Sequence, residues 1–151
     1  MRNIIFKKIE LKNFKCHKEM EFSFIPNRFI TITGKNGRGK TSIFDALIWA
    51  LFDMTTKGNS GNSVIRKRAG KNCSVQLTFN IDDDEYEIIS YRSHYKFGNE
   101  KKLIKNNVDI SEPTRKQTNR KIEDLLMPIN VFMNCMLFSQ YVSASFIDLN
   151  H

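Results

Sequence analysis

Alternating hydrophobic and polar residues predict a series of β-strands along this chain. Residues 75–81 show the clearest alternation, with apolar side chains separated by Ser, Gln, Thr and Asn. The same period at residues 5–12, 20–24 and 86–91 predicts further strands. Because the acidic residues 82–84 interrupt the pattern with a turn, we expect the strands on either side of them to pair as a hairpin.

A strand, a glycine-rich loop and a helix are predicted in succession between residues 29 and 52. Residues 29–33 (FITIT) indicate a buried strand, and the largely apolar residues 42–52 indicate a helix with little polar surface. The loop between them reads GKNGRGKT and fits the phosphate-binding pattern G-x-x-x-x-G-K-[ST]. A glycine-rich turn that ends in Lys-Thr by chance would not require both flanking elements. The chain is therefore predicted to bind a nucleoside triphosphate.

Each chemical feature of that loop has a physical role. Gly34, Gly37 and Gly39 allow backbone angles and a close approach to phosphate that a Cβ would block. Backbone N–H groups of the loop and the positive end of the helix dipole attract the anion. Lys40 would reach the β- and γ-phosphates, and the Thr41 hydroxyl would bind magnesium.

The C-terminal half of the chain predicts smaller elements. Residues 103–104 and 108–110 are expected to form a second hairpin, and a helix should run from Ser111 to about Leu126, where Pro128 ends it. Neither an internal repeat nor a low-complexity linker appears, so one domain covering residues 1–151 is expected.

Composition narrows the class of protein. The three Cys and three His are scattered, so neither a metal site nor a disulfide framework is predicted. No apolar run approaches the roughly 20 residues of a membrane span, and residues 1–4 lead into a strand without room for a signal peptide. We therefore expect an intracellular protein with no membrane partner.

The net charge of +8 is unevenly distributed. Basic residues gather in two groups, one at Lys57, Arg66, Lys67, Arg68 and Lys71, the other at Lys96, Lys101, Lys102 and Lys105. Such groups suit a polyanionic partner such as nucleic acid, although any single Lys is as readily explained by a solvated surface.

Parts of a complete nucleotide-hydrolysing site are missing from the sequence. Hydrolysis needs an acidic residue at the end of an apolar strand to hold magnesium, and a group that positions water. Asp84 belongs to an acidic turn, and Asp148 follows too short an apolar run. The guanine-recognition patterns Asp-x-x-Gly and Asn-Lys-x-Asp are absent. The chain is thus expected to supply half of a catalytic site.

Several motifs together resemble one family. They are Ile9-x-Leu11-x-Asn13-Phe14, the loop continued to Asp45-Ala46, and a late Phe138-Ser139-Gln140. This combination resembles the N-terminal ATPase lobe of the SMC-like ABC ATPases, and within them the SbcC-type ATPase of a double-strand-break repair exonuclease. The implied fold is α/β: a P-loop NTPase of the ABC N-terminal-lobe type, with a mixed sheet, antiparallel hairpins and a P-loop helix. In that family the lobe ends near the Q-loop and a coiled coil follows, so residues 1–151 would be a fragment or one chain of a split protein.

The resemblance assigns roles to individual residues of the loop and of the Q-loop. Residues that match the phosphate cradle are Asn36, Gly37, Gly39, Lys40, Thr41 and Ser42. Gln140 matches the Q-loop glutamine, which links magnesium and the γ-phosphate to the neighbouring lobe. Two positions depart from the pattern: Arg38 replaces a small residue and would contact phosphate or the dimer partner, and Tyr141 stands where glycine is common.

Outside the loop, the resemblance assigns further nucleotide contacts. Lys15 stands where the family usually has a basic residue touching the nucleotide. Arg66, Lys67 and Arg68 fall where a loop approaches the base and ribose, and DNA contact remains the alternative for them.

The resemblance also implies a function. The chain would be the ATP- and Mg²⁺-binding lobe of a DNA repair or recombination ATPase, located in the cytoplasm or nucleoid, or in the nucleus if its source is eukaryotic or viral. Its partners would be a C-terminal ATPase lobe, a nuclease subunit, DNA and a second copy in an ATP-dependent head-to-tail dimer. Alone, it would bind ATP without efficient hydrolysis. The alternatives are an SMC or RecF-like ATPase without a nuclease, and a small-molecule kinase, which the strands ahead of the P-loop disfavour.

Overall fold

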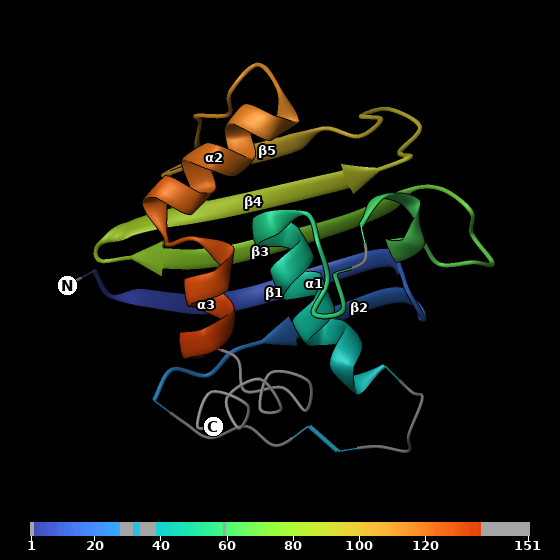
Figure 1. Ribbon diagram of the computed structural model, residues 1–151, viewed down its shortest axis with the longest axis horizontal. Coiled ribbons are helices and arrows are strands. Elements are labelled where there is room, and N and C mark those ends of the chain that lie inside the picture. The colour runs from blue at the N-terminus through green and yellow to red at the C-terminus, as the bar shows by residue number, and fades with distance from the viewer. Residues whose placement is uncertain (1, 28–31, 34–38, 59, 137–151) are drawn as a thin grey trace, which may run out of the picture.

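The computed structural model describes residues 2–27, 32–33, 39–58 and 60–136. Within these residues the chain forms a six-stranded sheet in the order β2-β1-β3-β4-β5-β6. The strands are β1 (Ile4–Phe14), β2 (His17–Ser23), β3 (Cys73–Ile81), β4 (Asp84–Arg92), β5 (Lys101–Lys105) and β6 (Val108–Asp109). The helices are α1 (Lys40–Phe52), the short 3-10 helix η1 (Gly61–Val64), α2 (Arg115–Leu125) and α3 (Ile129–Met136). Figure 1 shows α1, α2 and α3 on the same face of the sheet.

The alternation seen in the sequence gives the sheet one buried face. In β3 every second side chain is buried, from Cys73 through Val75 to Ile81, and the side chains between them are half-buried. The antiparallel register sets Leu11 of β1 opposite Val75 and Ile9 opposite Leu77, so apolar side chains of neighbouring strands share that face. The core therefore lies between the sheet and the helices.

The three helices cover the buried face in different ways. Nearly every residue of α1 from Ser42 onward is buried, because the helix contacts β1, β3, β4 and α2. α2 begins at an N-cap, Thr114, whose hydroxyl oxygen accepts a hydrogen bond from the Gln117 N–H. In α3 the buried Phe132 packs edge-on against Phe52 of α1, with 5.4 Å between ring centroids.

Most predicted elements are present, with shifted ends. β1 and β3 extend beyond the predicted residues 5–12 and 75–81. The predicted second strand, at residues 20–24, begins earlier, because His17 already pairs with Phe14. The helix expected from Ser111 begins at Arg115, since Thr114 caps it and the segment before it is extended.

The α/β class and the antiparallel hairpins are confirmed. All described strand pairs are antiparallel. The parallel component of a mixed sheet is not among them, and the strand expected at residues 29–33 lies largely outside the described residues. Assignment of the whole chain to one domain stays a prediction.

Candidate nucleotide-binding site

The turn between β1 and β2 packs against the first turn of α1. His17 Nε2 lies 3.3 Å from the carbonyl oxygen of Gly39, and Cys16 Sγ lies 3.6 Å from Ser42 Oγ. Gly39 has a φ of 88°, and a Cβ added there would lie 2.5 Å from Cys16 Sγ. Position 39 therefore needs glycine for its backbone angle and for the close approach of a neighbouring turn.

Part of the predicted phosphate loop falls within the described residues. Gly39, Lys40, Thr41 and Ser42 form the start of α1, with Thr41 exposed and Lys40 half-buried. The positive end of the helix dipole makes this end attractive to an anion. Gly34, Asn36, Gly37 and Arg38 lie outside the described residues, as does Gln140.

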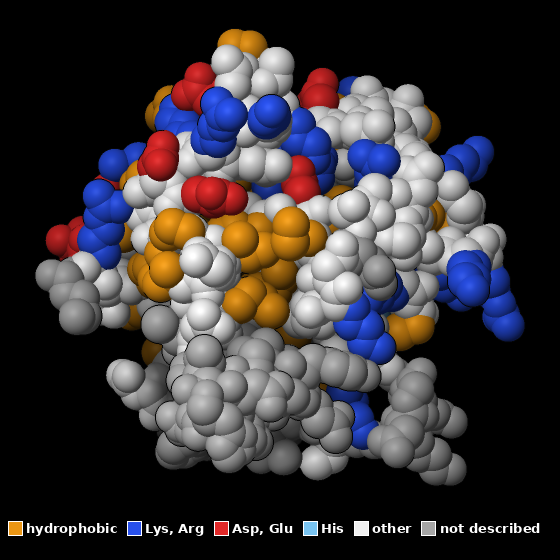
Figure 2. Space-filling view, in the orientation of Figure 1, with side chains coloured by type: hydrophobic (Ala, Val, Ile, Leu, Met, Phe, Trp, Pro, Cys, Tyr) orange, Lys and Arg blue, Asp and Glu red, His pale blue; other side chains and the backbone are white. Residues whose placement is uncertain are grey.

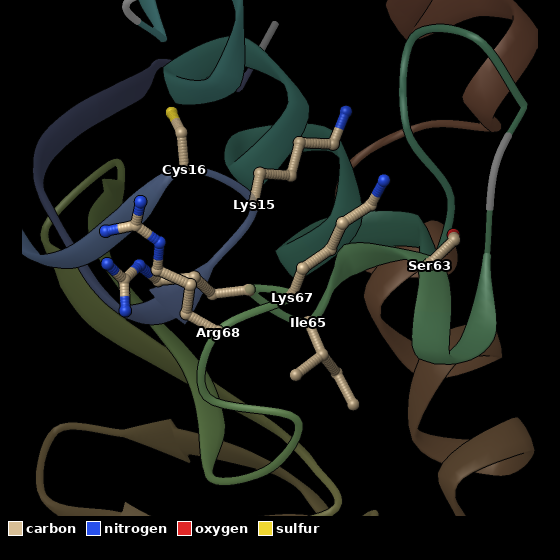
Figure 3. Close-up of a pocket in the computed structure, with 7 residues that line it drawn as sticks. Lys15, Cys16, Ser63, Ile65, Lys67 and Arg68 are labelled. Carbon is tan, nitrogen blue, oxygen red and sulfur yellow. The ribbon is translucent and has the colours of Figure 1, made fainter.

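A basic cleft lies beside this helix start. It encloses about 510 Å³ and is lined by Lys15, Cys16, Ser63, Ile65, Arg66, Lys67 and Arg68. In Figure 3 the side chains of Lys15 and Lys67 extend in the same direction, whereas Ile65 points the other way. The structure thus brings together Lys15 and residues 66–68, which sequence reasoning assigned separately to the nucleotide.

Backbone hydrogen bonds hold the two walls of the cleft together. The Lys15 N–H donates to the Val64 carbonyl at 2.7 Å, and the Arg66 N–H donates to the Asn13 carbonyl at 2.8 Å. Asn13 and Lys15 both have a positive φ, which lets the chain turn sharply at the end of β1. Backbone pairing therefore fixes where the two walls that carry the basic residues lie relative to each other.

Asp45 is a further member of the site whose contacts the sequence did not reveal. Its buried carboxylate forms an ion pair with the Lys15 ammonium through Oδ2. Its Oδ1 accepts hydrogen bonds from the N–H of Thr56 at 3.0 Å and from the Thr56 hydroxyl at 2.5 Å. An acidic residue on the buried side of an apolar helix is a signal for such a paired charge, since carboxylates are rarely buried without a partner.

The second basic group predicted from the sequence is only partly exposed. Lys101 is 4% exposed, and its ammonium donates hydrogen bonds to Asp53 and Asn119 on the face of the sheet that the helices cover. The expectation that it faces a polyanion is wrong, because alternation along β5 turns Lys101 toward the helices and Lys102 toward the opposite face. Lys105 forms an ion pair with Asp84 at 2.7 Å.

Neither a metal cluster nor a membrane-spanning helix is found in the described part of the chain. Its residues contain no group of three or more His, Cys, Asp or Glu that could hold a metal ion. None of its helices has the length and apolar character required to cross a membrane.

Comparison with known proteins finds a matching family model and similar ATPases. A family model described as an AAA domain matches residues 8–148. A DNA double-strand break repair Rad50 ATPase of Methanocaldococcus jannaschii is 30% identical over 97% of this chain and 14% of its own length. The SbcC component of the nuclease SbcCD of Deinococcus radiodurans is 24% identical over 87% of this chain and 15% of its own length.

A solved structure shares the fold. The recombination mediator protein RecF bound to ATP matches with a TM-score of 0.55 at 17% identity, over 74% of this chain and 29% of that chain. These findings confirm the resemblance to SMC-like ATPases of the Rad50 and SbcC kind. The chain spans only about one seventh of the length of these Rad50 and SbcC relatives.

Proposed function

Because the chain belongs to the AAA domain family, we propose that it binds ATP with magnesium and serves as one lobe of a DNA-repair ATPase. The observation that carries this proposal is the basic cleft at the start of α1. There Lys15, just after β1, and residues 66–68, in the loop after η1, line one cleft.

The residues present fit a nucleotide with its magnesium ion. Gly39 has a φ of 88°, a backbone angle that glycine adopts readily and that a glycine-rich phosphate loop can use. Gly34, Asn36, Gly37 and Gly39 would form the cradle, Lys40 would hold the terminal phosphates, and Thr41 and Gln140 would bind magnesium. When bound, that ion neutralises charge on the phosphate oxygens.

The basic wall of the cleft would hold the remainder of the nucleotide. The ion pair with Asp45 and the backbone bond to Val64 fix Lys15 before any ligand arrives, so less side-chain entropy is lost on binding. Lys67 and Arg68 are exposed at the mouth of the cleft, where they can meet the ribose and phosphates.

The same geometry argues that the lobe needs a partner for hydrolysis. Both carboxylate oxygens of Asp45 are engaged by Lys15 and Thr56, so this residue is not available to activate water. The described residues that line the cleft include no acidic residue. We propose that a C-terminal lobe supplies the missing carboxylate, and that closure of two such heads on ATP controls DNA binding and a nuclease partner.

Calorimetry with Mg-ATP tests the binding step. Lys40→Ala should weaken ATP binding by about tenfold or more, since it removes a charged hydrogen-bond donor from the terminal phosphates. Lys71→Ala is the matched control, because Lys71 is an exposed lysine outside the cleft lining. Equal ATP affinity in the wild type and Lys40→Ala would contradict the proposed site.

A further inference from the structure

The loop that joins β4 to β5 is held in a fixed shape by its own hydrogen bonds. Residues 93–99, here called the aromatic tip, close through His94 and Gly98, whose N–H groups each donate to the other's carbonyl at 2.9 and 2.8 Å. His94 Nδ1 accepts from the N–H groups of Lys96 and Phe97, at 3.2 and 3.3 Å. The Tyr95 N–H donates to Asn72 Oδ1 at 2.8 Å, which ties the tip to the start of β3. The tip is thus preorganised.

Four aromatic rings form a row along this tip. Tyr91 and Phe97 stack with 4.5 Å between ring centroids, and His94 meets Tyr91 edge-on at 4.9 Å. Tyr95 stacks on His94 at 4.8 Å and an interplanar angle of 27°. Tyr95 is 82% exposed, so the row ends in a ring whose outer face meets solvent. A large aromatic side chain that a rigid loop exposes in this way can stack on a planar ligand.

Two lysine ammonium groups lie beside the rings. The ammonium groups of Lys96 and Lys102 lie over the Phe97 ring, 5.3 and 5.0 Å from its centroid. Neither forms an ion pair with a carboxylate of the described residues. A cleft of about 360 Å³ adjoins the row and is also lined by Lys12 and Glu10. Glu10 pairs with Lys8 at 3.4 Å, which offsets its charge.

From this arrangement we infer that the aromatic tip binds single-stranded DNA, with a base stacked on Tyr95 and neighbouring phosphates held by Lys96 and Lys102. Aromatic faces beside unpaired lysines are the combination that binds unpaired nucleotides without sequence preference. A duplex keeps its bases stacked on one another, so it would use the lysines and leave the Tyr95 ring without a role. The inference rests on the proposed action on DNA, but not on the nucleotide cleft.

Fluorescence anisotropy with a labelled oligothymidylate of about 12 nucleotides tests this inference. Tyr95→Ala should weaken binding by roughly fivefold or more, whereas Tyr95→Phe keeps the ring and should bind like the wild type. Lys96→Gln should instead flatten the plot of log affinity against log salt by about 0.7. Val108→Ala, which trims an exposed apolar residue on the neighbouring hairpin, should change nothing.

A blunt duplex of the same length separates the possible outcomes. A loss confined to the single strand in Tyr95→Ala supports stacking. Equal affinity of the wild type and Tyr95→Ala for the single strand, or an equal loss on both substrates, overturns the inference. Duplex binding without single-strand binding also overturns it while leaving the proposed DNA-repair role intact.

Discussion

Gly39 meets two requirements at one position. Its φ of 88° lies in the left-handed region, and its missing Cβ leaves space for Cys16 Sγ and His17 Nε2, which would lie 2.5 and 2.6 Å away. Gly58 has a similar φ of 74° but nothing within 4 Å of the same added atom. The two glycines therefore separate the cost of a backbone angle from the cost of a collision.

Replacing each glycine by alanine measures that difference. Gly58→Ala should lower the free energy of unfolding by about 1 kcal/mol through backbone strain alone. Gly39→Ala should cost about 1–3 kcal/mol more, because the turn between β1 and β2 must shift. It should also weaken ATP binding. Urea unfolding followed by Trp49 fluorescence, with calorimetry on the folded variants, provides both measurements. Equal stability of the two variants would mean that the turn between β1 and β2 moves away from the added Cβ at no cost in free energy.

For individual residues, the sequence indicated chemical roles better than it indicated which side chains form contacts with each other. The pattern of glycines, Lys40 and Thr41 predicts a phosphate loop, because that chemistry depends on local spacing, and this assignment stays a prediction. The pairing of Lys15 with Asp45 could not be predicted by spacing, because it depends on how the end of β1 packs against α1. Sequence reasoning placed Lys15 at the nucleotide only through the family resemblance.

The C-terminal end of α1 is joined to α2 and β5 by a network of charged groups in which Lys101 is buried and Asp53 and Arg115 are half-buried. Arg115 donates to both carboxylate oxygens of Asp53, at 2.7 and 2.6 Å, and Lys101 donates to Asp53 and to the Leu51 carbonyl, each at 3.2 Å. Burial favours the neutral acid, but Lys101 and Arg115 outweigh it and lower the pKa of Asp53 below 3.8. Burial also lowers the pKa of Lys101, to about 8, against the opposing charge of Asp53.

Asp53→Asn should destabilise the chain by about 3 kcal/mol near neutral pH, since it leaves the buried Lys101 and the half-buried Arg115 without their anion. Lys101→Met should cost less, because Asp53 keeps Arg115. The folded-state pKa of Asp53 is depressed, so its contribution is fully present above about 3.8 and is lost as the pH falls through the lower folded value. Urea titrations from pH 3 to 7 should show the gap between wild type and Asp53→Asn closing only at the acid end. A difference in stability between wild type and Asp53→Asn that does not depend on pH would show that the charge of Asp53 is not its cause.

The sequence predicted a strand well where buried and less buried side chains alternate. It predicted the end of an element poorly where a contact with another residue sets that end. The period-two pattern of β3 predicted its buried face, because alternate side chains of a strand point to opposite faces of the sheet. Parity also explains the error at Lys101, which was grouped with Lys102 by proximity in sequence although neighbours on a strand face opposite ways. The start of α2 depended on Thr114, whose capping hydrogen bond competes with continuation of the helix.

On the scale of the whole molecule, charge is distributed between the cleft and the outer surface. Figure 2 shows the helix-bearing face, where hydrophobic side chains gather near its middle and basic side chains lie toward its margins. Lys67 and Arg68 line the cleft with Lys15, whereas Lys71 lies outside that lining. We therefore propose that residues 66–68 serve the nucleotide, and contact with DNA remains the alternative for them.

Charge reversal tests this division. The double change Lys67→Glu and Arg68→Glu should weaken ATP binding and leave the salt dependence of duplex binding nearly unchanged. For the wild type, the plot of log affinity for duplex DNA against log salt should have a slope of about −4 to −5, as expected for four to six phosphate contacts. Lys71→Glu should keep the affinity for ATP and make that slope shallower by about the contribution of one phosphate contact. Calorimetry and anisotropy at several salt concentrations measure both effects. The reverse result would assign residues 67 and 68 to DNA.

The pairing of β1 with β3 affects how the chain folds. These strands pair directly, although β2, α1 and η1 lie between them in the chain. The residues that line the cleft all lie between the end of β1 at Phe14 and the start of β3 at Cys73. Closing such a long loop costs entropy before its contacts form, so the cleft exists only after these strands have met. A bound nucleotide should therefore prolong the life of the folded chain and leave its rate of folding unchanged.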